Sequence, residues 1–354
     1  VIVGPHATVY AKDILQNCEL IDFVIAGEYE IGIKQLVDCL SNNLPLKEVK
    51  GLYFRYNNVV QNYSAYTDII IPLDILPMPA RELFPDDEFP NIELYKDGFC
   101  QYFPSVQLQL SRGCPFRCYF CLWNQVMYRN SGYRKFSIKR AVDEVEYVVK
   151  KYKAKELYFD DDDFTADKAY VIGICREILY RGIRVKWSCM GNAMNLDDEM
   201  IFWMVKSGCI GIKFGVESGD EYLCKTIGKP MDLKKVMQIT KLLNKYGVKT
   251  HATFTFGLIR ETKLSMLHTL HYAIKLPTDT VQFSICTPYP NTKMYNVLKK
   301  MKYLHDFNFT DIDGSCKCLV DYPGLSAEEI EQFFNKAFRK WILNKLITPS
   351  WIFR

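Results

Sequence analysis

The chain has 354 residues, a length typical of about two domains. Its composition, 49% hydrophobic and 24% charged, is ordinary for a soluble globular protein. The net charge is +4, and the lysines and arginines form no dense run, which gives no support for a nucleic-acid or membrane-surface partner. The longest apolar stretches are too short to span a bilayer.

The first 62 residues predict parallel α/β organisation. Residues 1–3 and 21–25 are apolar runs typical of buried parallel strands, and a helical pattern follows each, the second over 31–40. Residues 51–60 predict a hairpin with an Asn-Asn turn. Short strands that alternate with helices favour a layered α/β unit for residues 1–62.

A proline-rich stretch, residues 63–103, is predicted as a linker. Residues 104–290 then repeat a strand–helix unit six times, and a helix over 137–151 is expected to begin with Ser137 as its N-cap. The expected strands are 106–110, 156–159, 184–188, 211–215, 249–256 and 280–285. Six units rather than eight predict an incomplete (β/α) barrel, followed by a C-terminal helical segment over 291–354.

Three of the 13 cysteines, Cys114, Cys118 and Cys121, lie on one short loop with the spacing CxxxCxxC. Three thiolates at this spacing suit three irons of a cubic iron–sulfur cluster, whereas electron-transfer clusters normally take four cysteines. An open metal position is typical of a site that binds a further ligand. The odd cysteine count argues against a disulfide framework, so free thiols and a cluster predict a reducing cytoplasm.

Two other interpretations of these cysteines are a zinc site and three unrelated thiols. Zinc needs a fourth ligand at a matching knuckle, and none follows Cys121. The remaining cysteines are scattered singly along the chain, so the grouping on this loop favours the cluster over chance.

Several polar residues fall directly after predicted strands. Asp160 to Asp163 follow the second strand, Glu217 and Ser218 follow the fourth, and Glu261 follows the fifth. Because the carboxyl ends of parallel strands share one edge of a sheet, we expect these side chains and the cysteine loop to converge. Four adjacent carboxylates repel one another, so the alternative is a solvated turn, but Asp161 or Asp162 is well placed to face an ammonium group.

The run from Arg112 to Cys121, including the aromatic Phe120, resembles the cluster-binding motif of the radical S-adenosylmethionine (SAM) superfamily. Stretches 157–165, 214–219, 256–262 and 287–290 resemble later strand ends of the same barrel, although Asn192 and the sequence at 258–262 depart from its usual pattern. The resemblance implies a [4Fe-4S] cluster held by the three cysteines and SAM bound to the open iron.

The resemblance also implies roles for single residues. The backbone of Phe120 lies against the SAM adenine, Asp161 and Asp162 face the SAM amino group, and Glu217 and Ser218 meet its ribose or carboxylate.

Before the cysteine loop, residues 1–8 and 22–30 resemble the later half of a cobalamin-binding domain, and 73–80 resembles the linker that joins it to the barrel. This resemblance implies that His6, in a shortened Gly-Pro-His motif, contacts one face of the cobalamin. The half of that domain that carries the cobalt-ligating histidine of many relatives is absent, so we expect a fragment. The expected fold is α/β: a partial (β/α)6 TIM-like barrel preceded by the C-terminal half of a Rossmann-like cobalamin-binding domain.

The resemblance predicts an enzyme that cleaves SAM reductively to a 5′-deoxyadenosyl radical. It predicts cobalamin-assisted C-methylation, or cyclisation or rearrangement, of a small molecule, porphyrin or lipid, with flavodoxin or ferredoxin as the electron donor. The cofactors are a [4Fe-4S] cluster, SAM and, if the parent protein carries it, cobalamin. These groups, rather than the protein side chains, supply the radical chemistry. Two alternatives are a tRNA methylthiotransferase and an iron–sulfur binding module without turnover.

Overall fold

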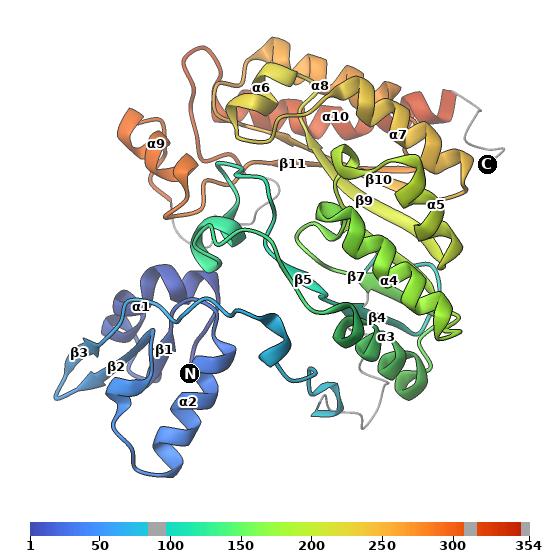
Figure 1. The fold of residues 1–354 in the computed structure, drawn as a ribbon. Coiled ribbons are helices and arrows are strands. Elements are labelled where there is room, and N and C mark those ends of the chain that lie inside the picture. Colours follow the sequence, from blue (N-terminus) through green and yellow to red (C-terminus); the bar gives the residue numbers. More distant parts are fainter. Residues whose placement is uncertain (84–96, 308–316, 348–354) are drawn as a thin grey trace.

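A computed structural model describes residues 1–83, 97–307 and 317–347. It contains an N-terminal unit around a three-stranded sheet and a larger unit around a six-stranded sheet (Figure 1). Residues 84–96 of the predicted linker lie outside the described residues, as do residues 308–316 and 348–354 of the predicted C-terminal segment. No described helix is long and apolar enough to cross a membrane.

The N-terminal unit consists of three strands and two helices: α1 (Pro5–Asn17), β1 (Phe23–Ile25), α2 (Glu30–Ser41), β2 (Leu52–Tyr56) and β3 (Val59–Asn62). Strand β2 is central and antiparallel to both neighbours. Asn57 and Asn58 have φ angles of 50° and 61°, the left-handed conformation that a two-residue hairpin turn needs, so the predicted turn is confirmed.

The prediction of a buried strand over residues 1–3 is wrong. Only Ile2 pairs with β1, in one parallel bridge to Val24, and Val1 and Ile2 are 59% and 39% exposed. A single bridge leaves these side chains largely in solvent. The sheet is therefore mixed, because the other neighbour of β1 is the antiparallel strand β2.

The larger sheet is parallel throughout and follows the order β11-β10-β9-β8-β7-β4. Its strands are β4 (Ser105–Leu108), β7 (Glu156–Phe159), β8 (Lys186–Gly191), β9 (Cys209–Glu217), β10 (Lys249–Phe256) and β11 (Thr280–Ile285). All six predicted strands are present, within four residues at each end. No ladder joins β4 to β11 in the described ranges, so the sheet is the predicted partial barrel, left open.

Helices cover one face of this sheet (Figure 1). They are α3 (Ile138–Tyr152), α4 (Lys168–Tyr180), α5 (Asp198–Lys206), α6 (Glu221–Thr226), α7 (Leu233–Lys245), α8 (Lys263–Lys275) and, from the C-terminal segment, α10 (Ala327–Ile347). Ser137 caps α3 as predicted, by accepting a hydrogen bond from the backbone of Arg140. Between sheet and helices, Phe159, Phe164 and Trp187 form a fully buried aromatic cluster.

The three cysteines lie in a long loop between two short strands, β5 (Ser111–Arg112) and β6 (Arg134–Lys135), which pair with each other. This loop lies between the N-terminal unit and the large sheet (Figure 1). Its first turn requires glycine, because Gly113 has a φ of 81° and an added Cβ would lie 2.2 Å from the carbonyl oxygen of Gly132. Helix α9 (Lys293–Met301) contacts the loop through the amide of Met294, which donates to the Tyr119 carbonyl.

Candidate functional site

A cavity of about 620 Å³ opens where the large sheet, the cysteine loop and the N-terminal unit meet. Its wall combines the loop after β1, the cysteine loop and the carboxyl ends of β7, β8 and β9. Active sites of barrels and open α/β sheets form at this end of the strands. The predicted convergence with the cysteines is therefore present for Asp160 to Asp163 and for Glu217, whereas Glu261 is buried and does not line the cavity.

Cys114, Cys118 and Cys121 are half-buried, and all three line the cavity. Burial raises the pKa of each thiol, that of Cys118 to about 12. Thiols ligate iron as thiolates, so cluster binding must displace their protons.

Two amide side chains that sequence reasoning missed, Asn124 and Gln125, hold the cysteine loop in shape. Asn124 Nδ2 donates to the carbonyls of Cys114 and Phe116 at 3.0 and 2.7 Å. Gln125 Nε2 donates to three further loop carbonyls, those of Cys118, Tyr119 and Cys121, at 2.9, 3.0 and 3.1 Å. In the sequence these residues are two adjacent amides shortly after the third cysteine. They lie outside the cysteine motif, so the motif does not predict their role.

The donor set fits a cubic cluster better than a single ion. No group of three His, Cys, Asp or Glu side chains in the described residues is gathered tightly enough for one metal ion. Thiolates on a cubic cluster each bind a different iron, so they need only face one cavity, as these three do. Among the described residues that line the cavity there is no fourth cysteine and no histidine.

A buried ion pair, which sequence reasoning did not foresee, lies beside the cysteines. Lys229 Nζ donates to Glu217 at 2.7 Å, and the two side chains are 12% and 11% exposed. Burial acts to lower the pKa of Lys229, but the neighbouring Glu217 carboxylate and the thiols of Cys118 and Cys114 outweigh it, and the net shift is upward. The ammonium is thus placed to favour the thiolate forms of the ligands.

Strand β9 is distorted so that Glu217 enters the cavity. Its register against β10 slips by one residue at this point, because Thr253 pairs with Gly215 and Phe254 pairs with Glu217. Glu217 itself has a φ of 68°, an unfavourable conformation for this residue type. Gly215 makes room, since an added Cβ would lie 2.3 Å from the Glu217 carboxylate and 2.6 Å from Lys229 Nζ. Bulges and strained residues of this kind cluster at functional sites.

Asp161 and Asp162 both line the cavity and both hold the start of the cysteine loop. Asp161 accepts hydrogen bonds from the Leu110 amide, at 3.1 Å, and from the Ser111 hydroxyl. Asp162 accepts from the Gly113 amide at 2.7 Å. Burial raises the pKa of both carboxyls, that of Asp161 to about 7. Contact with the SAM amino group stays a prediction for both.

The outer two aspartates of the run differ from each other. Asp163 accepts from the backbone and hydroxyl of Thr165 and from the Asn195 amide, and its carboxylate lies 3.9 Å from the Cys114 sulfur. Asp160 lines the same cavity, and its carboxylate accepts no hydrogen bond from a described residue, although the Lys213 ammonium acts on it electrostatically. Burial raises the pKa of both carboxyls, that of Asp163 to about 6. In the described residues, the Asp160 carboxylate and the second oxygen of Asp161 are therefore the parts of the run without a hydrogen-bond donor.

The remaining predicted residues divide into two groups. Phe120 lines the cavity, and so does Asn192, whose side chain caps a short turn after β8. Ser218 is fully buried behind the wall, where its hydroxyl lies 3.0 Å from that of Thr269. His6 is exposed on the first turn of α1, beside Tyr10, and does not line the cavity.

Comparison with known proteins adds three findings. The sequence pattern of the radical SAM superfamily matches residues 108–273. An uncharacterized methyltransferase of Pyrococcus horikoshii is 30% identical over all of this chain and 74% of its own length. The anaerobic magnesium-protoporphyrin IX monomethyl ester cyclase of Cereibacter sphaeroides is 26% identical over 87% of this chain, which spans only 50% of that enzyme.

Among solved structures, the radical SAM methyltransferase TsrM from Kitasatospora setae, with cobalamin and a [4Fe-4S] cluster bound, has the same fold. The TM-score is 0.72 at 17% identity, over 94% of this chain and 66% of TsrM. The likeness includes the open parallel sheet and extends into the N-terminal unit.

Proposed function

Because the chain belongs to the radical SAM superfamily, we propose that its cavity binds a [4Fe-4S] cluster and SAM and promotes reductive cleavage of SAM. When bound, these groups supply a 5′-deoxyadenosyl radical, which abstracts hydrogen from a substrate. One observation carries the proposal: three cysteines line a cavity whose described wall offers no fourth cysteine and no histidine. The open iron is then available to SAM.

The chain's own residues bind, orient and shield the reacting groups. Cys114, Cys118 and Cys121 are the cluster ligands, and the buried Lys229 beside them favours their thiolate forms. Phe120, Asp162 and Glu217 line the wall where SAM would lie against the cluster. Ser218 supports this wall from behind, through its contact with Thr269.

We further propose that the reaction is a cobalamin-assisted methylation, or a cyclisation or rearrangement. This is supported by TsrM, a methyltransferase with bound cobalamin whose fold resembles this chain over 94% of its length, and by the names of the two sequence relatives. The N-terminal unit borders the cavity through Glu28, Tyr29 and Glu30, where a second cofactor would face the barrel mouth. The substrate is a small molecule, and a flavodoxin or ferredoxin would deliver the electron.

The test of the cluster and SAM site is electron paramagnetic resonance (EPR) spectroscopy after anaerobic reconstitution and reduction. We expect a [4Fe-4S] signal that changes on addition of SAM, because SAM occupies the open iron. A variant in which Cys114, Cys118 and Cys121 are all alanine should hold no such cluster. A cluster whose signal ignores SAM would show a saturated, non-catalytic iron–sulfur module and would overturn the proposal.

A matched control is the Cys175→Ala variant, since Cys175 is buried in the core far along the chain from the loop. It removes one thiol without touching the cavity and should keep both cluster and SAM response. Cobalamin binding is tested separately by its visible absorption after gel filtration of the same protein.

A further inference from the structure

The cysteine loop is closed by two arginines that face each other. Arg112 and Arg134 are directly opposite in the β5–β6 pair, and Arg112 lies two residues before Cys114. Like charges at paired positions of an antiparallel ladder destabilise it. The side chains are only 12% and 8% exposed, so water screens this repulsion poorly. The two strands that frame the cluster loop therefore require an anion between them.

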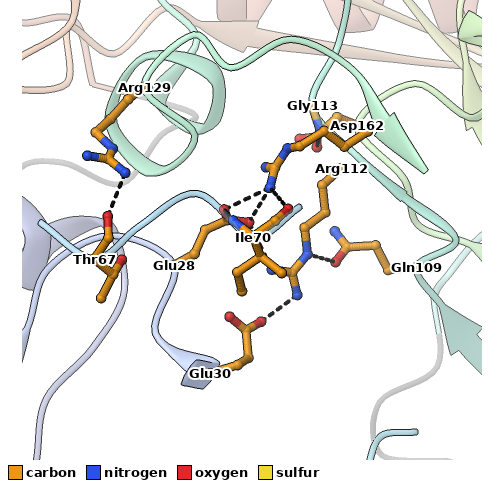
Figure 2. Close-up of polar contacts among 10 residues, drawn as sticks. Glu28, Glu30, Thr67, Ile70, Gln109, Arg112, Gly113, Arg129 and Asp162 are labelled. Atoms are coloured by element: carbon orange, nitrogen blue, oxygen red, sulfur yellow. Dashed lines mark hydrogen bonds and ion pairs between the residues drawn. The ribbon is translucent and has the colours of Figure 1, made fainter. Parts of the chain in front are cut away.

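That anion comes from the N-terminal unit (Figure 2). The Glu28 side chain, 1% exposed, accepts from Arg112 Nη1 at 3.0 Å and from Arg134 Nη1 at 3.0 and 2.8 Å. It also accepts from the Ile70 amide at 3.0 Å, and Arg134 donates to the Ile70 carbonyl at 2.9 Å. One carboxylate thus joins the N-terminal unit, the segment that follows it and both strands of the cysteine loop.

Glu28 is the carboxylate in direct contact with both arginines; Asp162 also lies near them but forms no ion pair with either in the described residues. Arg112 has a second carboxylate, Glu30, but Glu28 is the only carboxylate that pairs with Arg134 there. The Nε and Nη2 atoms of Arg134 are buried without a hydrogen-bond partner. Removing the Glu28 charge would leave the buried Arg134 guanidinium without a carboxylate in direct contact, which is far less favourable than losing an exposed pair.

We propose that Glu28 is a positioning residue for the iron–sulfur site: it holds the β5–β6 pair closed and sets the charge beside the cluster. The proposal rests on the proposed function only for the identity of the cluster. Glu28 lies 84 residues before Arg112 and 106 before Arg134, so the N-terminal unit is part of the cluster site rather than an appendage to it.

Two measurable properties depend on this contact. Without Glu28 the Arg112 and Arg134 charges repel, the β5–β6 pair weakens, and the cysteines lose their shared cavity. Loss of one negative charge near Cys114 also stabilises the reduced, more negative cluster, so its midpoint potential moves in the positive direction. Loss of packing alone would not move the potential in a defined direction.

The test compares Glu28→Gln, Arg134→Met and the double variant Glu28→Gln/Arg134→Met, with Asp38→Asn as control. Asp38 forms an exposed pair with Lys34 in the same unit. For the protein without cluster, we expect Glu28→Gln to raise the unfolding equilibrium constant about a hundredfold or more, because a buried charge loses its partner. The double variant should recover most of this loss, since it removes one charge of each sign, and Asp38→Asn should change little.

After reconstitution, Glu28→Gln should bind fewer irons per chain, and EPR-monitored titration of the cluster that remains should give a more positive midpoint potential. The double variant should return the potential toward that of the unmodified chain. An unchanged potential in Glu28→Gln, or additive losses in the double variant, would overturn the proposal. Unfolding and midpoint potential are measured without SAM and test the role of Glu28. A failure to cleave SAM would therefore count against the proposed function and not against the role of Glu28.

Discussion

At the cavity wall, Lys229 and Glu217 form a buried ion pair. Removing either side chain would leave the charge of the other without its partner. Glu217 has one other described partner, the hydroxyl of Thr255 at 2.9 Å. A buried carboxylate that loses its ammonium partner destabilises the folded state by several kcal/mol, whereas replacing both partners by neutral groups is often nearly neutral.

We therefore expect Lys229→Met to lower the free energy of unfolding by about 3 kcal/mol, measured by urea titration. Glu217→Gln/Lys229→Met should recover most of that loss. Lys225→Met changes an exposed lysine at the end of α6 and is the matched control. Lys229→Met as stable as the unmodified chain would contradict a tightly coupled pair.

A second residue makes stability depend on pH. Burial raises the pKa of Glu261 from 4.5 to about 7, although the Leu258 amide and the Ser265 hydroxyl both donate to its carboxylate. Between these pH values the folded chain keeps a proton that the unfolded chain has released. The contribution of Glu261 to the free energy of unfolding is therefore full below pH 4.5 and is lost as the pH rises through 7.

Glu261→Gln carries no titrating group and should remove this slope. We expect the decrease in unfolding free energy between pH 5 and pH 8 to be smaller in Glu261→Gln than in the unmodified chain, by up to about 3 kcal/mol. Urea titrations at the two pH values measure it. Glu328→Gln, at an exposed position of α10, serves as control, and equal slopes in all three proteins would rule out the assignment to Glu261.

At the scale of elements, side-chain amides supplement the backbone hydrogen bonds of the cysteine loop. Gln125 donates to three loop carbonyls, and its own Oε1 accepts from the Lys293 amide at the start of α9 at 2.7 Å. One residue thus fixes the loop and ties it to the end of the barrel.

Gln125→Ala removes one donor from each of the three carbonyls and the acceptor of the Lys293 amide; the Cys118 and Tyr119 carbonyls keep a backbone donor each, from Cys121 and Met294. We expect the loss to destabilise the loop by about 1–3 kcal/mol. The expected result is less iron bound per chain after reconstitution, with little change in overall helix content by circular dichroism. Gln332→Ala removes an exposed amide that bonds only to Glu328 within α10, and it should bind iron normally. Equal iron content in the two variants would show that the loop is held by other contacts.

The elements that were predictable are those encoded by local pattern. Apolar runs located all six strands of the large sheet, and the cysteine spacing located the cluster loop. Contacts that join distant segments left no such pattern: Lys229 follows Glu217 by 12 residues, with helix α6 between them, and Glu28 meets Arg134 across 106 residues. The buried strand expected over 1–3 failed for the same reason, because burial depends on what covers a run and not on the run alone.

At the scale of the molecule, the cavity belongs to both units. The large sheet contributes the acidic strand ends, and the N-terminal unit contributes Glu28, Tyr29 and Glu30 to the same wall. A site built this way needs the two units to stay together. The Glu28 contacts with Arg112 and Arg134 supply that connection directly at the cysteine loop.

The measurement that tests the central claim most directly is product analysis after anaerobic cluster reconstitution, with SAM and a chemical reductant, in the presence and absence of cobalamin. We predict 5′-deoxyadenosine that requires reductant and is absent from the variant lacking Cys114, Cys118 and Cys121. S-adenosylhomocysteine that requires cobalamin would add methyl transfer. No 5′-deoxyadenosine from protein with an intact cluster, or formation that survives loss of the three cysteines, would contradict the account.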